Sequence, residues 1–254
     1  MNAPGRVTLV GAGPGDPELL TVKAVRAIRA ATVLLVDDLV GDGVLRYARR
    51  SARVVHVGKR GGCASTPQDF IERLMIAEAQ RGEAVVRLKG GDPSVFGRSG
   101  EELEHLRAAG VAVTVVNGIT SGLAAANALG VPWTHRDHAR GVMLVTGHAR
   151  DGGAAPDWTA LGVACAQGLT LVVYMGVSQL TAIVAGLRDA LGSDMPAALV
   201  QSASTPNERR LVSTLANIVD TAAAHEIGSP AVLIVGAVLT PLSAADTAAV
   251  SAAA

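Results

Sequence analysis

The chain has 254 residues, 49% of them hydrophobic, and equal numbers of basic and acidic side chains, 22 of each. This content is enough for one large core or two smaller ones, and the zero net charge argues against a nucleic-acid-binding protein. No apolar run reaches the length of a membrane span, and the first six residues lack the pattern of a signal peptide. We therefore expect a globular cytoplasmic protein without nucleic-acid or membrane partners.

The first half of the chain alternates short apolar runs with turns rich in glycine. The apolar runs predict strands at residues 7–10, 32–36, 53–57, 85–89 and 111–116. Segments with helical patterns start at Asp16 or Pro17, at Thr66, at Glu101 and at Thr120 or Ser121. Because most glycine turns follow strands, this order predicts an α/β domain with a largely parallel sheet.

Two of these helices have patterns specific enough to predict their caps and buried faces. Asp16 suits an N-cap and Pro17 a first helical position, and the apolar face of that helix should contain Leu19, Val22, Val25 and Ile28. The residues from Thr66 to Asp69 have the pattern of a capping box, and the helix after them should end at Gly82 and bury Phe70, Leu74 and Ala77.

The second half of the chain predicts another α/β unit. Its apolar runs indicate strands at 142–146, 169–175, 196–200 and 231–235, with a further possible strand at 210–213, and an amphipathic helix at 178–191. We expect a first domain at residues 1–118, a second at 119–254, and a linker at about 117–140.

The segment Gly90-Gly91-Asp92-Pro93 follows a buried strand and has the composition of a binding loop. Two glycines allow the backbone to approach a ligand closely, although a tight turn alone would also require glycine. The first glycine turn, 11–17, departs from the dinucleotide motif GxGxxG because Asp16 stands where that motif needs glycine. Nicotinamide or flavin binding is therefore the lesser alternative.

Charged residues follow two further strands, at Asp37-Asp38 and at Lys59-Arg60. The carboxyl edge of a parallel sheet is where α/β proteins bind ligands, so these groups are candidates for acid, base or anion-binding roles. Solvated loop charges are the alternative. The three histidines His135, His138 and His148 have no partner at metal-ligand spacing, and we expect no metal site.

Cys63 and Cys165 have no CxxC spacing, and we expect both to be reduced rather than joined in a disulfide.

Several motifs occur together in one order along residues 6 to 240, and the chain resembles the uroporphyrinogen-III C-methyltransferases of the tetrapyrrole methylase family. The segments that support this resemblance are 11–17, Asp37-Asp38-Leu39-Val40, 57–60, 86–93, Phe96-Gly97-Arg98, 118–121, Thr134-His135-Arg136-Asp137 and 145–148. An ordered series of motifs is more specific than any one of them. The resemblance implies two α/β domains with the active cleft between them, a homodimer, and methylation by S-adenosylmethionine of a tetrapyrrole, uroporphyrinogen III, to precorrin-2.

The resemblance also implies roles for individual residues. Asp37 matches the position of a proton acceptor and Lys59 that of a proton donor, and Arg98, Glu101 and Arg136 match positions that face the substrate. The positions that match the cofactor site are Pro14, Gly90, Gly91, Asp92, Val95, Thr120, Ser121, Met175, Ala203 and the backbone near Ala231. Guanidinium groups at such positions would hold the carboxylates of the substrate.

Other functions stay open from the sequence. Another precorrin methyltransferase of the same fold is the nearest alternative, and a ribose methyltransferase acting on ribosomal RNA is a more distant one. A binding protein without turnover, or a nicotinamide-dependent oxidoreductase, would belong to a different class. Ser99 stands where glycine is usual after Phe-Gly-Arg in the family, and it could change the placement of Arg98 and Glu101.

Overall fold

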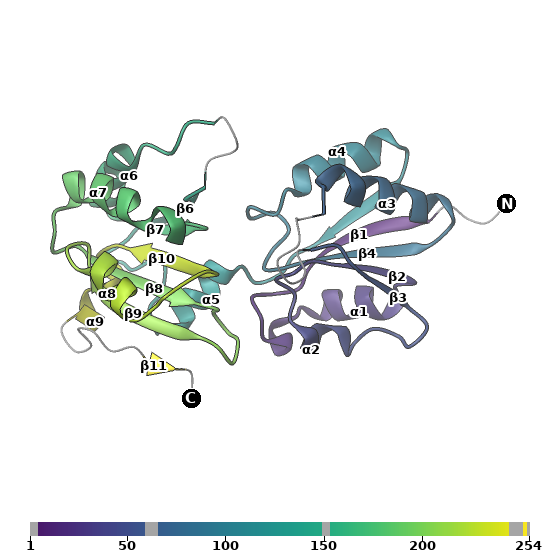
Figure 1. The fold of residues 1–254 in the computed structure, drawn as a ribbon, viewed down its shortest axis with the longest axis horizontal. Coiled ribbons are helices and arrows are strands. Elements are labelled where there is room, and N and C mark those ends of the chain that lie inside the picture. The colour runs from purple at the N-terminus through teal and green to yellow at the C-terminus, as the bar shows by residue number, and fades with distance from the viewer. Residues whose placement is uncertain (1–4, 59–65, 149–152, 244–250, 253–254) are drawn as a thin grey trace. The chain divides into compact units, whose positions relative to one another are not determined.

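The computed structural model describes residues 5–58, 66–148, 153–243 and 251–252. The chain divides into two compact units, Met1–Thr120 and Ser121–Ala254, and each is described here by itself (Figure 1). No described helix is both long enough and apolar enough to cross a membrane.

The sheet of the first unit has five strands that all run parallel, which confirms the α/β class predicted from the sequence. The strand order is β3-β2-β4-β1-β5. The strands are β1 (Arg6–Gly11), β2 (Val33–Val36), β3 (Arg53–His56), β4 (Ala84–Lys89) and β5 (Ala112–Val116). Since all five are parallel, the loops that follow them meet at one edge of the sheet.

Helices cover both faces of this sheet, with α1 and α2 on one face and α3 and α4 on the other (Figure 1). Their bounds are α1 (Val22–Ala30), α2 (Asp42–Leu45), α3 (Gln68–Gln80) and α4 (Ser99–Ala108). Successive strand residues point to opposite faces. Leu34 and Leu88 belong to the core beneath α1 and α2, whereas Leu35 and Val85 belong to the core beneath α3 and α4.

Two helix predictions were wrong in detail. Asp16 caps only a short 3-10 turn (Pro17–Leu19), and α1 starts afresh after Thr21, whose hydroxyl accepts a hydrogen bond from Ala24 N. Val22, expected in the core, is therefore 68% exposed.

In α3 the N-cap is Pro67, and no side chain caps the helix, so the predicted capping box does not form. The buried face of α3 contains Ile71 and Met75, and Phe70 is exposed.

The second unit has a mixed sheet of six strands in the order β11-β9-β8-β10-β7-β6. Its strands are β6 (Gly141–Thr146), β7 (Leu169–Tyr174), β8 (Pro196–Gln201), β9 (Arg209–Thr214), β10 (Ala231–Val235) and β11 (Ser251–Ala252). β10 runs antiparallel to both β7 and β8, while β6 and β7 are parallel. The strand expected at 210–213 is therefore confirmed, as the antiparallel partner of β8.

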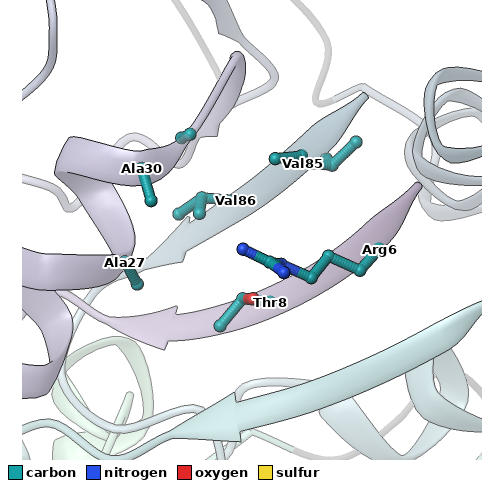
Figure 2. Close-up of a pocket in the computed structure, with 8 residues that line it drawn as sticks. Arg6, Thr8, Ala27, Ala30, Val85 and Val86 are labelled. Atoms are coloured by element: carbon teal, nitrogen blue, oxygen red, sulfur yellow. The ribbon is translucent and has the colours of Figure 1, made fainter. Parts of the chain in front are cut away.

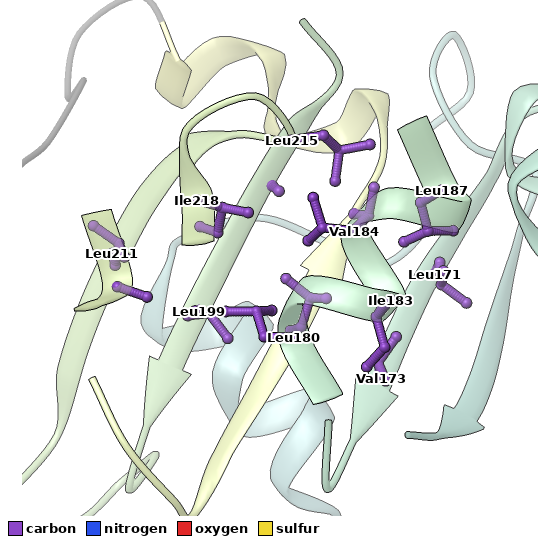
Figure 3. Close-up of a cluster of buried hydrophobic side chains, with 14 of the residues drawn as sticks. Leu171, Val173, Leu180, Ile183, Val184, Leu187, Leu199, Leu211, Leu215 and Ile218 are labelled. Atoms are coloured by element: carbon purple, nitrogen blue, oxygen red, sulfur yellow. The ribbon is translucent and has the colours of Figure 1, made fainter. Parts of the chain in front are cut away.

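Helices also lie on both faces of the second sheet. On one face, a hydrophobic core is formed by strand residues such as Leu171 and Leu199 with Ile183 and Leu187 of α7 (Leu180–Leu191), as Figure 3 shows. The helices α6 (Trp158–Ala166) and α8 (Ile218–Ala224) were not predicted from the sequence.

The helix α5 (Ser121–Ala128) packs on β7 and β10. A Cβ atom at Gly122 would lie only 2.3 Å from the Tyr174 hydroxyl oxygen, so an alanine here would force the Tyr174 side chain to move.

Candidate functional site

The carboxyl edge of the first sheet brings together most of the predicted site residues of that unit. Pro14 lies in the loop after β1, and Asp37 follows the last residue of β2 directly. The segment 90–92 follows β4, whose Lys89 is in register with Gly11 of β1. Parallel strand order thus places the loops after β1, β2 and β4 at one edge, as in other α/β ligand sites.

Asp92 ties two of these loops together. Its Oδ2 atom accepts hydrogen bonds from Gly118 N at 2.9 Å and from Asn117 Nδ2 at 3.2 Å. Its Oδ1 atom accepts one from Ser94 N at 2.7 Å. The carboxylate is only 8% exposed. Asp92 therefore holds the loop after β4 against the loop after β5, and in this structure its three hydrogen bonds serve the fold of the edge.

The glycines of these loops pack against one another. Gly13 and Gly91 exchange two backbone hydrogen bonds, with N to O distances of 3.2 and 2.7 Å. A Cβ atom at Gly118 would lie 2.2 Å from the Gly91 oxygen, which no real side chain could tolerate. The sequence predicted that glycine serves close approach to a ligand. The structure adds that the glycines first allow backbones to approach each other.

Asp37 lies beside a buried cation. Its Oδ1 atom is 3.8 Å from Nη2 of Arg87, a β4 residue that is 3% exposed, and the Asp37 side chain itself is 36% exposed. The guanidinium group is an ionic partner for Asp37 and leaves one side of its side chain open to solvent. Lys59, the other predicted catalytic residue, lies outside the described residues.

Arg87 and its neighbour Lys89 both contact Glu102 of α4. Arg87 Nε is 3.4 Å and Lys89 Nζ is 2.8 Å from the Glu102 carboxylate, which is fully buried. Burial has the largest effect on the pKa of Lys89 and lowers it, although Glu102 acts in the opposite direction. None of these three residues was predicted from the sequence to have a role of its own. The available signal was a pair of charges inside a strand whose other residues are apolar, since buried charges need partners.

Arg98 and Glu101 form an exposed ion pair just after the loop that contains Val95. Arg98 donates to both Glu101 oxygens, at 3.1 and 2.6 Å, and this hydrogen bonding raises the pKa of the Arg98 guanidinium. Residues of the loop 93–100, with Leu103 and Val115, line a hollow of about 310 Å³. Ser99 keeps this loop closed, because its hydroxyl donates to the Pro93 carbonyl oxygen at 2.6 Å.

In the second unit, three predicted cofactor residues lie at one edge of the sheet. Met175 follows the end of β7, Ala203 follows the end of β8, and Ala231 begins β10. Because β10 is antiparallel to the other two strands, its first residue lies at the edge where they end. Ser121 begins α5 and precedes Gly122, which packs against Tyr174 at the end of β7. Arg136 is exposed in the loop before β6.

The loop that contains Ala203 is held by a buried carboxylate that the sequence analysis missed. Glu208 accepts a hydrogen bond from Ser204 N at 2.6 Å and one from Arg210 Nε at 2.7 Å. Ser202 and Ser204 have positive φ angles of 49° and 61°, and Met175 has 54°. Strained backbone of this kind collects at binding sites, because the surrounding contacts must enforce it.

A second hollow in the first unit does not fit a ligand. It lies between α1 and the strands β1 and β4, among Arg6, Ala30 and Val86 (Figure 2), and its volume is about 30 Å³. That is the volume of roughly one water molecule in the liquid. Arg6 and Val86 lie away from the loops that follow the strands, so this hollow is separate from the site.

The remaining candidates add no site. Cys165 is buried, which raises the pKa of its thiol to about 11, so the group is a neutral packing side chain at physiological pH. The rings of His135 and His138 stack with centroids 4.6 Å apart. Across the residues that the structure describes, no group of three or more His, Cys, Asp or Glu side chains is placed to hold a metal ion.

Comparisons with known proteins place these residues in a family. Residues 6–219 match the family model described as Tetrapyrrole (Corrin/Porphyrin) Methylases. A uroporphyrinogen-III C-methyltransferase from Pseudomonas aeruginosa is 52% identical over 235 residues, which cover 92% of this chain and 94% of that protein. A siroheme synthase from Pseudomonas putida is 48% identical, and the match spans 92% of this chain but half of that longer protein.

A solved structure adds a ligand to the comparison. The uroporphyrin-III C-methyl transferase from Thermus thermophilus in complex with S-adenyl homocysteine aligns with a TM-score of 0.78 and 44% identity. The alignment covers 93% of this chain and all of that one.

Proposed function

The chain is a member of the tetrapyrrole methylase family, and we propose that it is an S-adenosylmethionine-dependent C-methyltransferase that converts uroporphyrinogen III to precorrin-2 by methylating C2 and C7. The observation that carries this proposal is the 52% identity to a uroporphyrinogen-III C-methyltransferase along nearly its whole length. The likeness to a structure with adenosylhomocysteine bound supports the cofactor. The similarity to a siroheme synthase supports the proposal that the precorrin-2 made by this protein is used for sirohaem synthesis.

The residues present fit an adenosylmethionine site. Such a ligand needs backbone polar groups, hydroxyls and apolar cover, and it needs no phosphate cradle. We assign its binding in the first unit to Pro14, Gly90, Gly91, Asp92, Val95 and Thr120, and in the second to Ser121, Met175, Ala203 and Ala231. Close glycine packing at Gly118 and Gly13 fixes the loops on which the first group lies, and Glu208 fixes the loop of Ala203. When bound, the cofactor supplies an electrophilic methyl group.

The chain's own residues align the reactants and move a proton. After the macrocycle carbon takes the methyl group, that macrocycle must lose a proton, and Asp37 is the proposed acceptor. Arg87 lies on the inner side of Asp37, 3.8 Å from its Oδ1 atom, and the exposed side of Asp37 gives access to a substrate. Lys59 is the proposed proton donor. Positioning of the macrocycle carbon, the methyl group and the sulfur in line supplies most of the rate acceleration. The reaction needs no covalent intermediate with the protein.

Arg98, Glu101 and Arg136 are the proposed substrate contacts. The substrate carries many carboxylates, and a guanidinium can hold a carboxylate through two parallel hydrogen bonds. Glu101 orients Arg98 at the rim of the 310 Å³ hollow, where one carboxylate side chain of a macrocycle could bind. Local cations of this kind would allow a protein of zero net charge to bind a polyanion.

The division of residues 1–118 and 119–254 into two domains is supported by the two compact units of the chain. A homodimer in the cytoplasm is also part of the proposal, on the strength of the family resemblance. Size-exclusion chromatography with light scattering tests the dimer, and a monomer at micromolar concentration would contradict it.

Anaerobic incubation of the purified protein with uroporphyrinogen III and adenosylmethionine, followed by mass analysis of the macrocycle, tests the function. Gain of two methyl groups supports the proposal. Binding of adenosylmethionine with no change in that macrocycle would instead favour another precorrin methyltransferase of this fold, and precorrin substrates would then be tested in the same assay.

A further inference from the structure

A cluster of four charged side chains joins strand β4 to the site. Glu102 lies at its centre and contacts both Lys89 and Arg87, and Arg87 in turn contacts Asp37. We call these four residues the ion cluster. The exposed fraction of the Arg87, Lys89 and Glu102 side chains is at most 5%, whereas Asp37 is 36% exposed. The cluster therefore extends from the interior of the first unit to the solvent-facing edge of its sheet.

The register of the sheet explains why these charges meet. Alternate residues of a strand point to the same face. On β4, Val85 belongs to the core beneath α3 and α4, so Arg87 and Lys89 point to that face as well. Asp37 continues the same alternation on β2, after Leu35. Glu102 is the carboxylate that α4 supplies to this face.

Arg87 forms the link between the buried carboxylate and the exposed one. Its Nε atom faces Glu102 at 3.4 Å, its Nη1 atom donates to the Leu88 carbonyl oxygen at 3.2 Å, and its Nη2 atom is 3.8 Å from Asp37. Because a guanidinium group is planar and rigid, fixing its Nε side also fixes the direction of Nη2.

The charges of the ion cluster also balance. Two cations face two carboxylates, so removal of the Glu102 charge would leave Arg87 and Lys89 with Asp37 as the remaining carboxylate of the cluster. Gln68 of α3 reinforces the arrangement, since its amide donates to Glu102 at 3.1 Å. Without the Glu102 charge, Arg87 would have to reorient. Asp37 would keep the hydrogen bond that its Oδ1 atom accepts from Asp38 N at 3.2 Å but would lose its ionic partner.

From these contacts we infer that Glu102 is a positioning residue for methyl transfer, which orients Arg87 and through it holds the Asp37 carboxylate where the substrate's proton must be accepted. This inference rests on the proposed function, because Asp37 is the proposed proton acceptor there. The Glu102 side chain is fully buried, and its backbone N donates to the carbonyl oxygen of Arg98, a proposed substrate contact, at 3.4 Å. This backbone bond does not involve the Glu102 carboxylate. A change of that carboxylate alone should therefore lower turnover and leave binding nearly unchanged.

The chain offers a matched control in Glu78 of α3. Glu78 is 1% exposed and, like Glu102, pairs with two cations, Arg53 and Arg81. It lies near the opposite edge of the sheet, since its helix ends beside Gly5, before the start of β1. Glu78→Gln should therefore lower stability without lowering kcat.

The test compares Glu102→Gln, Glu78→Gln, Asp37→Asn and the double variant Glu102→Gln with Asp37→Asn in the methylation assay. We expect Glu102→Gln to lower kcat about 10- to 100-fold, while KM for the macrocycle and the Kd of adenosylhomocysteine change less than about twofold. In the Asp37→Asn background the same substitution should lower kcat by less than about twofold further, because the two residues act as one unit.

Three results would overturn the inference: an unchanged kcat in Glu102→Gln, a loss equal to that of Glu78→Gln, or a full additional loss in the Asp37→Asn background. If Glu102→Gln does not fold, Arg87→Lys gives the same test, since it keeps the charge but lacks the second arm that reaches Asp37. A fully active Asp37→Asn would instead refute the proposed role of Asp37, and a wild-type protein without methyl transfer would refute the proposed function.

Discussion

Replacing Asp92 tests whether its carboxylate holds the loops of the candidate site together. In Asp92→Ala, three donors lose their acceptor: Gly118 N, Asn117 Nδ2 and Ser94 N. Asp92→Asn keeps one side-chain oxygen, which can still accept hydrogen bonds from the donors on one side of the residue. Its NH₂ group would face a donor on the other side and could not accept a hydrogen bond from it. The alanine variant should therefore be the less stable of the two.

The contacts set the size of the effect. A hydrogen bond to a charged group contributes about 1.5 kcal/mol or more, and donors that solvent can reach recover part of that. Loss of three such bonds at an 8% exposed carboxylate predicts that Asp92→Ala lowers the free energy of unfolding by roughly 3 to 5 kcal/mol. Asp92→Asn should lower it by roughly 1 to 3 kcal/mol.

Urea unfolding followed by circular dichroism measures these differences, and calorimetry of adenosylhomocysteine binding measures the effect on the site. Asp69→Ala is the control, because the ion pair between Asp69 and Arg73 is exposed and its loss should change stability by less than about 1 kcal/mol. The reasoning fails if Asp92→Ala is as stable as this control, or if Asp92→Asn is less stable than Asp92→Ala. Loss of binding with unchanged stability would mean that Asp92 serves the ligand and not the loops.

Three further predictions concern other parts of the chain. Gly122→Ala should destabilise the second unit by about 2 kcal/mol or more, because its Cβ would clash with the Tyr174 hydroxyl. In thermal unfolding, Tyr174→Phe in the same chain should recover part of this loss. No recovery would exclude this clash as the cause. In a Cys63→Ser background, Cys165 should resist alkylation at pH 8 and react only when urea unfolds the chain. The reason is that a thiol pKa of about 11 keeps Cys165 protonated in the folded protein. Rapid labelling of the native protein would contradict this. Arg98→Ala should raise KM for the macrocycle about tenfold without changing adenosylhomocysteine affinity. Arg107→Ala, in the last turn of the helix that Arg98 precedes, should change neither, and equal effects of the two variants would refute a specific carboxylate contact.

The gathering of the loops at one sheet edge could be predicted from the sequence, because parallel strands deliver their following loops to the same side. Asp37 and the segment 90–92 were placed together on that basis, and the structure brings them to the same edge. The role of Glu102 could not be predicted. Its partners Arg87 and Lys89 lie on a strand 13 to 15 residues earlier, and only the packing of α4 on that strand shows that they meet.

The errors in the helices also have local causes. The start of α1 was misplaced because two neighbouring residues are N-caps. Asp16 caps the short 3-10 turn, and Thr21 caps the longer helix α1. The helix α6 was missed because its sequence, from Trp158 to Ala166, has no polar face that would give a helical period. The antiparallel β10 was not foreseen, since a fully apolar run looks the same in either direction.

The stoichiometry of methyl transfer tests the central claim most directly. With a limiting amount of uroporphyrinogen III under anaerobic conditions, two molecules of adenosylhomocysteine should be released for each macrocycle consumed. The product mass should rise by two CH₂ units, because each methyl group gained replaces a hydrogen lost as a proton. Release of adenosylhomocysteine without methylation of this macrocycle, or no release at all, would contradict the claim.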